Sequence, residues 1–135
     1  MDKLTVKQEV NNIYDLLISI RRHLHANPEL SFQEKNTALY ISSLLTDWNI
    51  SHETNIGGFG IVGLIKGNNP KSKIIAIRAD MDALPINENN DVDYCSINKG
   101  IMHACGHDVH MTCLLGTIKI LSENTDWFQG TIKFI

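Results

Sequence analysis

The chain has 135 residues, of which 43% are hydrophobic and 20% are charged, and its formal net charge is −3. This composition is typical of one globular domain or part of one, and the chain is long enough to bury a core. Because Lys and Arg are scattered, the sequence shows no basic surface for nucleic acid. No apolar run approaches the ~20 residues of a membrane span, and the N-terminal residues do not have the pattern of a signal peptide. The three cysteines form no CxxC pair and suit a reducing cytoplasm.

The N-terminal segment predicts one long helix. Apolar residues recur at steps of three and four over about residues 5–26, which is the pattern of an amphipathic helix. Asn27 is expected to end it, because the residue before Pro28 is pushed out of the helical region. His23 and His25 occupy the last turn, where polar or cationic side chains are favourable, so we expect them to be structural.

A second helix is predicted directly after this segment. Ser31 and Glu34 have the spacing of a capping box, in which each side chain accepts a hydrogen bond from the other residue's backbone N–H. The apolar pattern that follows predicts a helix to about Asp47. The glycine-rich stretch at residues 57–60 then predicts a flexible turn.

The second half of the chain changes to strand-like patterns. Strands are predicted at residues 61–66, at 73–80 as a buried β-branched run, and at 130–135. Residues 81–100 are predicted to be mostly loop, and a third helix is expected to open near Asp108. This order predicts an α/β fold class, with a central β-sheet flanked by helices.

The segment MHACGHDVH concentrates side chains that bind transition metals. Thiolates and imidazoles are the usual ligands of zinc-type ions, and Cys105 and His107 are two positions apart. This spacing does not fit one face of a helix, but it fits a turn in which Gly106 lets the backbone bend into a helix N-terminus. We expect Cys113 to be a core residue of the helix and Cys95 to be an ordinary loop thiol.

Each residue of this cluster also has an ordinary interpretation. Cys105 alone is compatible with a small buried residue, and His103 and His110 with surface positions. Asp108 is compatible with a helix N-cap, or with a carboxylate that orients a ligand imidazole. We expect His110 to have a structural or supporting role, and the cluster as a whole to bind metal.

A second polar cluster, RADMDALP, follows the predicted strand at residues 73–80. Asp80 and Asp82 alternate directly after the apolar run, which predicts a site at the carboxyl end of the strand. The alternative is a strand end with solvated acids, closed by Pro85. Arg78 is suitably placed for a plain salt bridge with Asp80.

Three motifs together resemble the M20 family of metallopeptidases and amidohydrolases. They are RRHLHANPELSFQE, IAIRADMDALPI and MHACGHDVHMTCLLG, in the order and spacing of the family. The subgroup with the greatest similarity comprises N-acyl-amino-acid amidohydrolases of the hippurate hydrolase, indole-acetyl-amino-acid hydrolase and N-acetyldiaminopimelate deacetylase type.

The resemblance implies a hydrolase with two divalent metal ions, of the manganese, zinc, cobalt or nickel kind. It implies that Cys105 is a bridging thiolate and that His107 is a ligand of one metal. It further implies that Asp82 orients a metal ligand, with Asp80 beside it. The expected reaction is attack of a metal-activated water on the amide of an N-acyl amino acid, with no nucleic-acid or membrane partner.

The resemblance also implies that residues 1–135 are the N-terminal portion of the metal-binding catalytic domain. The strand pattern runs to Ile135 without a closing turn. In the family, a Glu-Glu segment with the general base, further ligands and a dimerisation domain come later. We therefore expect the 135 residues alone to be inactive, and a homodimer only for a full-length chain. Two alternatives are a non-catalytic metal-binding or interaction remnant, and a thiol enzyme that pairs Cys105 with His103 or His107.

Overall fold

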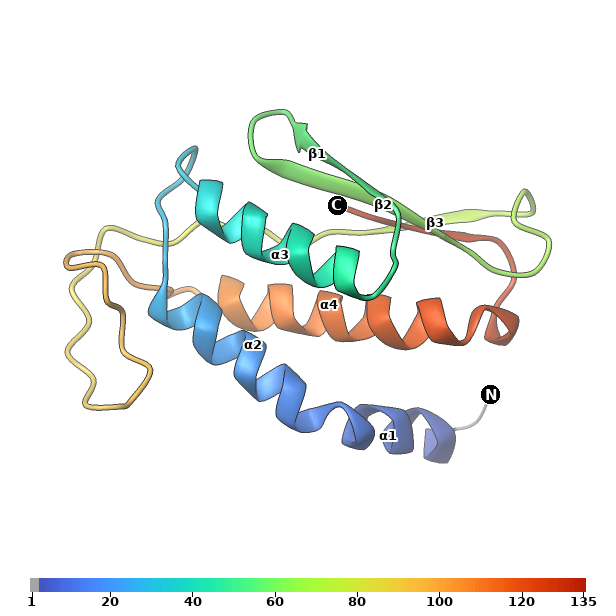
Figure 1. The fold of residues 1–135 in the computed structure, drawn as a ribbon, viewed down its shortest axis with the longest axis horizontal. Coiled ribbons are helices and arrows are strands. Elements are labelled where there is room, and N and C mark those ends of the chain that lie inside the picture. The colour runs from blue at the N-terminus through green and yellow to red at the C-terminus, as the bar shows by residue number, and fades with distance from the viewer. Residues whose placement is uncertain (1–2) are drawn as a thin grey trace.

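The computed structural model describes residues 3–135, which form helices and one mixed β-sheet (Figure 1). The mixed α/β class expected from the sequence is confirmed. In chain order the elements are α1 (Lys3–Asn12), α2 (Tyr14–Ala26), α3 (Lys35–Asp47), β1 (His52–Ile56), β2 (Gly60–Lys66), β3 (Ile74–Ile77), α4 (His107–Glu123), the 3₁₀ turn η1 (Thr125–Trp127) and β4 (Thr131–Phe134).

The sheet has the strand order β1-β2-β4-β3. β2 is antiparallel to β1 and to β4, whereas β3 and β4 are parallel and end at the same edge of the sheet. Ile132 of β4 pairs with Ile65 on one side and with Ile75 on the other, which places these three side chains on one face. The same register places Phe134 over Gly63, where any Cβ would overlap the aromatic ring.

The four helices lie on one face of the sheet (Figure 1). α3 and α4 contact the β1–β2 side of the sheet, and α2 packs along α4. On the opposite face Leu64 and Ile74 remain 47% and 68% exposed, so within residues 3–135 the sheet is covered on one side only. Burial of each large core side chain contributes about 1.5–3 kcal/mol. The core consists mainly of Ile20, Leu24, Ile41, Leu45, Ile65, Met111, Leu115, Ile118 and Phe134.

The first helical segment is two helices, so the prediction of one helix over residues 5–26 is wrong. The break falls at Ile13, whose φ of −109° and ψ of 11° are not helical. α1 buries no residue, whereas α2 buries Ile20, Leu24 and His25. Because of this break, α1 and α2 have different directions (Figure 1). The predicted end of the segment is confirmed, with Asn27 as the C-cap of α2.

The strands differ from the sequence prediction in two places. β3 covers only Ile74–Ile77 of the predicted residues 73–80. It is not buried, because within residues 3–135 it lies at the sheet edge and has β4 as its one neighbour. β1 was not predicted, since its HETNI sequence is polar and four of its five residues are exposed. Pairing with β2 stabilises β1 rather than burial of its own side chains. The predicted strands at residues 61–66 and 130–135 and the helix to Asp47 are confirmed.

The N-terminus of α3 is capped by Glu29, not by the predicted Ser31–Glu34 box. The Glu29 carboxylate accepts hydrogen bonds from the backbone N–H groups of Asn36 and Thr37 at 3.1 and 2.8 Å, and from both of their side chains. Glu34 instead accepts from the Phe32 N–H at 3.0 Å. The carboxylate of Glu29 thus satisfies two of the first-turn N–H groups of α3, which have no partner within the helix.

We expect Glu29→Gln to lower the free energy of unfolding by about 1 kcal/mol, because an amide replaces a charged acceptor at a helix N-terminus. Urea unfolding followed by circular dichroism measures this change. Glu34→Gln is the matched control, since its carboxylate accepts one hydrogen bond outside α3. Equal losses in the two variants would contradict the capping role of Glu29.

Candidate metal centre

Cys105 and His107 lie at the start of α4, where the sequence predicts a glycine turn. Gly106 is the N-cap of the helix and has a φ of 89°, a left-handed conformation that favours glycine. The Gly106 carbonyl accepts from the N–H groups of Val109 and His110 at 3.1 and 3.0 Å. The Cys105 thiol is exposed and free. The predicted turn is therefore present, with the thiol and the imidazole on either side of it.

Asp82 fixes the tautomer of His107. The Nδ1 atom of His107 lies 2.8 Å from the backbone carbonyl oxygen of Asp82 and 3.1 Å from its Oδ1. A backbone carbonyl only accepts, so Nδ1 carries a proton, and in the neutral imidazole the lone pair is then on Nε2. An imidazole oriented in this way is the usual arrangement of a histidine ligand, whose other nitrogen is held by a carboxylate or a carbonyl. The structure thus brings together Asp82 and His107, which are 25 positions apart.

Asp80 has a different partner. Its Oδ1 lies 2.6 Å from Nη2 and 2.8 Å from Nε of Arg78. The Arg78 and Asp80 side chains are 73% and 45% exposed, so this surface ion pair contributes no more than about 1 kcal/mol. The salt bridge suggested by the sequence is present, and it directs the Asp80 carboxylate to Arg78 rather than to His107.

Asp108 is a buried residue of the first turn of α4, and the first of its two interpretations, a helix N-cap, is not observed. Its side chain is 1% exposed, and Oδ2 lies 2.7 Å from His25 Nδ1 and 3.2 Å from Arg21 Nε. No side chain caps α4. Asp108 does orient an imidazole, as the second interpretation proposed, but it is that of His25 on α2 and not that of a candidate ligand.

Glu88 completes this buried group and was missed by the sequence analysis. Its Oε1 lies 3.0 Å from His25 Nε2, and Oε2 accepts from the Ser96 N–H at 2.7 Å. Burial alone would raise the pKa of Glu88, but hydrogen bonds from Ser96, Asn90 and His25 outweigh it and lower the pKa to about 2. No local pattern marks Glu88, since it follows the RADMDALP motif within a predicted loop.

His103 and Cys113 lie where the sequence did not place them. His103 is 4% exposed rather than on the surface, and neither ring nitrogen has a hydrogen-bond partner in the described part of the chain. Burial lowers the pKa of His103, which favours the neutral imidazole. Cys113 is exposed on α4 rather than in the core, and Cys95 is a loop thiol as expected. His110 is exposed, with its ring 6.0 Å from that of His107.

The donors present fit part of a metal site. A thiol and an imidazole with a free Nε2 are suitable ligand types for zinc and related ions. Within residues 3–135, however, no group of three or more His, Cys, Asp and Glu side chains is arranged to hold a metal ion. Catalytic sites use at least three protein ligands. Cys105 and His107 are therefore two candidate donors among the described residues, and Asp82 contacts one of them.

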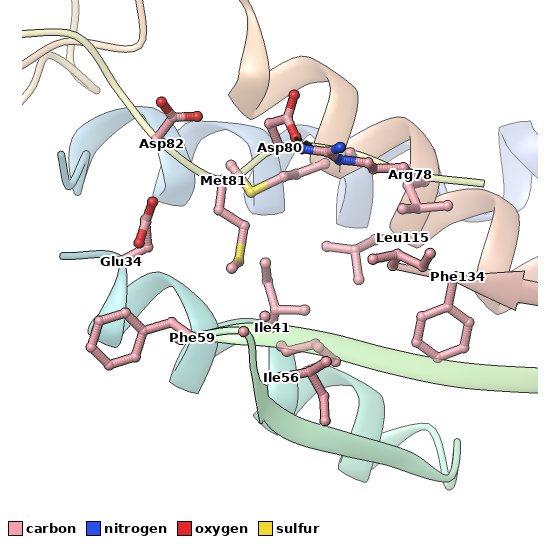
Figure 2. Close-up of a pocket in the computed structure, with 18 of the residues that line it drawn as sticks. Glu34, Ile41, Ile56, Phe59, Arg78, Asp80, Met81, Asp82, Leu115 and Phe134 are labelled. Carbon is pink, nitrogen blue, oxygen red and sulfur yellow. Dashed lines mark hydrogen bonds and ion pairs between the residues drawn. The ribbon is translucent and has the colours of Figure 1, made fainter. Parts of the chain in front are cut away.

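A cavity of about 480 Å³ borders this region (Figure 2). The Arg78–Asp82 segment forms one side of it, and Ile56 and Phe59 of the β1–β2 hairpin lie on the opposite side. Residues of α3 and α4 such as Ile41 and Leu115 line its interior, which makes it largely apolar. The carboxylates at its rim belong to Glu34, Asp80 and Asp82, whereas Cys105 and His107 do not line it. The cavity suits an apolar group beside the candidate metal ligands, rather than the metal itself.

Comparison with known proteins finds similarity to one family of metallopeptidases. The model of peptidase family M20/M25/M40 matches residues 76–135. A crystal structure from Bacillus subtilis, described as a dinuclear metal-binding peptidase of the M20 family, superposes with a TM-score of 0.86 at 39% identity, over 92% of this chain and 35% of that one. The sequence of residues 76–135 and the fold of the chain are therefore similar to those of M20 proteins. The family resemblance of the three sequence motifs is thereby confirmed.

The relatives found in the sequence comparison are about three times as long as this chain. Thermostable carboxypeptidase 2 of Saccharolobus solfataricus is 45% identical over 96% of this chain and 33% of its own length. An N-acyl-L-amino acid amidohydrolase of Geobacillus stearothermophilus is 43% identical over 100% of this chain and 36% of its own. The chain thus spans about a third of the length of the relatives that it matches. Among the described residues, no helix has the length and apolar character needed to cross a bilayer.

Proposed function

We propose that these residues form the part of an M20 amidohydrolase that supplies Cys105 and His107 to a pair of divalent metal ions. The substrate class is an N-acyl amino acid, whose amide is cleaved to a carboxylate and a free amine. The observation that carries the proposal is the hydrogen bond from His107 Nδ1 to the Asp82 carbonyl, because it leaves Nε2 free, two sequence positions from the exposed Cys105 thiol. Three free thiols suit a reducing compartment such as the cytoplasm.

In this proposal each described residue has a separate role. Cys105 and His107 Nε2 hold metal, and Asp82 keeps the His107 proton on Nδ1, so that the lone pair stays directed away from the loop. When bound, divalent metals polarise the substrate carbonyl and lower the pKa of a water molecule. Asp80 is paired with Arg78 at the surface, and we propose for it a role in fixing the Arg78–Asp82 segment.

The 135 residues alone are proposed to be inactive in hydrolysis. Among residues 3–135 no third donor completes a metal site with Cys105 and His107. A hydrolytic site also needs a general base. This state is compatible with a second candidate, a metal-binding chain that is not itself catalytic. The exposed Cys105 thiol favours either one over a buried structural cysteine.

Cobalt titration tests the metal part of the proposal. We expect Co²⁺ added to the 135-residue chain to give a thiolate-to-cobalt charge-transfer absorption that Cys105→Ala abolishes. Cys113→Ala is the matched control, because Cys113 is also exposed and free but lies within α4. A signal that persists in Cys105→Ala, or that is lost in Cys113→Ala, would contradict the assignment of Cys105.

A chimera tests the catalytic part. In it, these residues replace the matching third of the Geobacillus stearothermophilus amidohydrolase. We expect the chimera to hydrolyse N-acyl amino acids, the 135-residue chain to be inactive, and Cys105→Ala in the chimera to abolish turnover. A folded chimera that binds cobalt through Cys105 but shows no hydrolysis would support the non-catalytic candidate instead. Loss of activity with a thiol reagent but not with a chelator would favour a thiol enzyme.

A further inference from the structure

The loop from Asp82 to Glu88 is tied at both ends to the first turn of α4. At one end, the Asp82 carbonyl accepts from His107 Nδ1 at 2.8 Å. At the other end, Glu88 Oε1 lies 3.0 Å from His25 Nε2, and His25 Nδ1 lies 2.7 Å from Asp108 Oδ2. His107 and Asp108 are consecutive, so one loop reaches two neighbouring helix residues, one directly and one through His25.

The connection through His25 is ionic and buried. The side chains of Glu88, His25 and Asp108 are 3%, 5% and 1% exposed. An ionised carboxylate can only accept hydrogen bonds, so His25 donates from both ring nitrogens when both carboxylates are ionised. Arg21 adds a second positive charge at 3.2 Å from Asp108. The group of Glu88, His25, Asp108 and Arg21, here called the Glu88 bridge, then holds two negative and two positive charges.

We propose that Glu88 and His25 are positioning residues for His107. The Glu88 bridge holds the Asp82–Glu88 loop against the first turn of α4, and thereby keeps the Asp82 carbonyl within hydrogen-bond distance of His107 Nδ1. Two backbone hydrogen bonds of 3.0 Å between Leu84 and Met102 stiffen the loop between these anchors. The inference rests on the proposed function in one respect only, namely that Nε2 of His107 binds a metal ion.

The tautomer of His107 is the direct readout, and it needs no metal. Side-chain ¹⁵N NMR of the metal-free chain, above the ordinary histidine pKa of about 6.5, distinguishes protonation at Nδ1 from protonation at Nε2. We expect the Nδ1–H tautomer alone in the wild type and a mixture of both tautomers in Glu88→Gln. The dissociation constant for Co²⁺ should rise about tenfold in the same variant.

Two further variants keep the test decisive. Asn90→Ala removes the 2.9 Å hydrogen bond to Glu88 Oε1 but leaves every charge of the Glu88 bridge in place. We expect it to shift the tautomer in the same direction by a smaller amount, and it replaces Glu88→Gln should that variant fail to fold. Glu29→Gln is the matched control, because its carboxylate hydrogen-bonds to Asn36 and Thr37 of α3 and its backbone bond from Ala83 N–H is kept in the variant. Its His107 tautomer should match that of the wild type.

The outcomes separate this inference from the proposed function. An unchanged His107 tautomer in folded Glu88→Gln and Asn90→Ala would overturn the positioning role, and so would an equal shift in Glu29→Gln. A tautomer shift in a chain that shows no Cys105-dependent cobalt signal would support the positioning role while contradicting the metal site.

Discussion

Replacing Asp108 with alanine is expected to lower the free energy of unfolding by about 3–5 kcal/mol, which is the usual effect of removing one partner from a buried ionic group. The Asp108 carboxylate is 1% exposed and contacts both His25 and Arg21. Its removal leaves the 5% exposed His25 side chain with Glu88 as its remaining carboxylate. Since small domains have unfolding free energies of about 5–15 kcal/mol, the variant would lose much of its folding stability.

Urea unfolding at neutral pH measures this prediction, with Asp126→Ala as the control. Asp126 is exposed in η1, and its side chain has no hydrogen bond with another residue of the described range 3–135, so its replacement should change the stability by less than about 0.5 kcal/mol. A loss below about 1 kcal/mol in Asp108→Ala would show that the buried charges contribute little net energy, as some buried ion pairs do.

Local sequence patterns predicted the elements that local energetics determine. Pro28 disfavours a helical conformation at Asn27, and α2 accordingly ends with Asn27 as its C-cap. The periodicity predicted the start of α4 near Asp108, one residue from its observed start at His107. At the site, the residue types and their spacing indicated Cys105 and His107 as a pair around a glycine turn. The structure adds the contact between His107 and Asp82, which no local pattern contains.

The features that the sequence did not predict depend on contacts between distant segments. His25 is 83 positions from Asp108 and 63 from Glu88, so the ionic group forms only when α2, α4 and the loop meet. β1 has no apolar alternation and exists through its pairing with β2. The apolar run of β3 indicated burial, but burial depends on what covers a strand, and among the described residues β4 is its one neighbour.

The stability of the chain is expected to fall steeply in acid because of Glu88. Its pKa is lowered to about 2 from an ordinary value of 4.5, so the folded state favours the ionised carboxylate. A carboxyl group with a lowered pKa stabilises the fold fully above the ordinary value, and this contribution is lost as the pH falls through 4.5 toward 2. The hydrogen bonds from Ser96 and Asn90 and the contact with His25 are the physical source of this stabilisation.

Glu88→Gln isolates this contribution, because glutamine does not titrate. We expect the difference in unfolding free energy between wild type and Glu88→Gln to be largest at neutral pH and to shrink as the pH falls toward 2. Glu123→Gln is the control, since Glu123 is 54% exposed in a surface pair with Lys119 and should show a small difference at every pH. A difference between wild type and Glu88→Gln that stays constant down to the acid limit would mean that the pKa of Glu88 is the same in the folded and unfolded chain. The stabilisation assigned to the ionised Glu88 carboxylate would then be wrong.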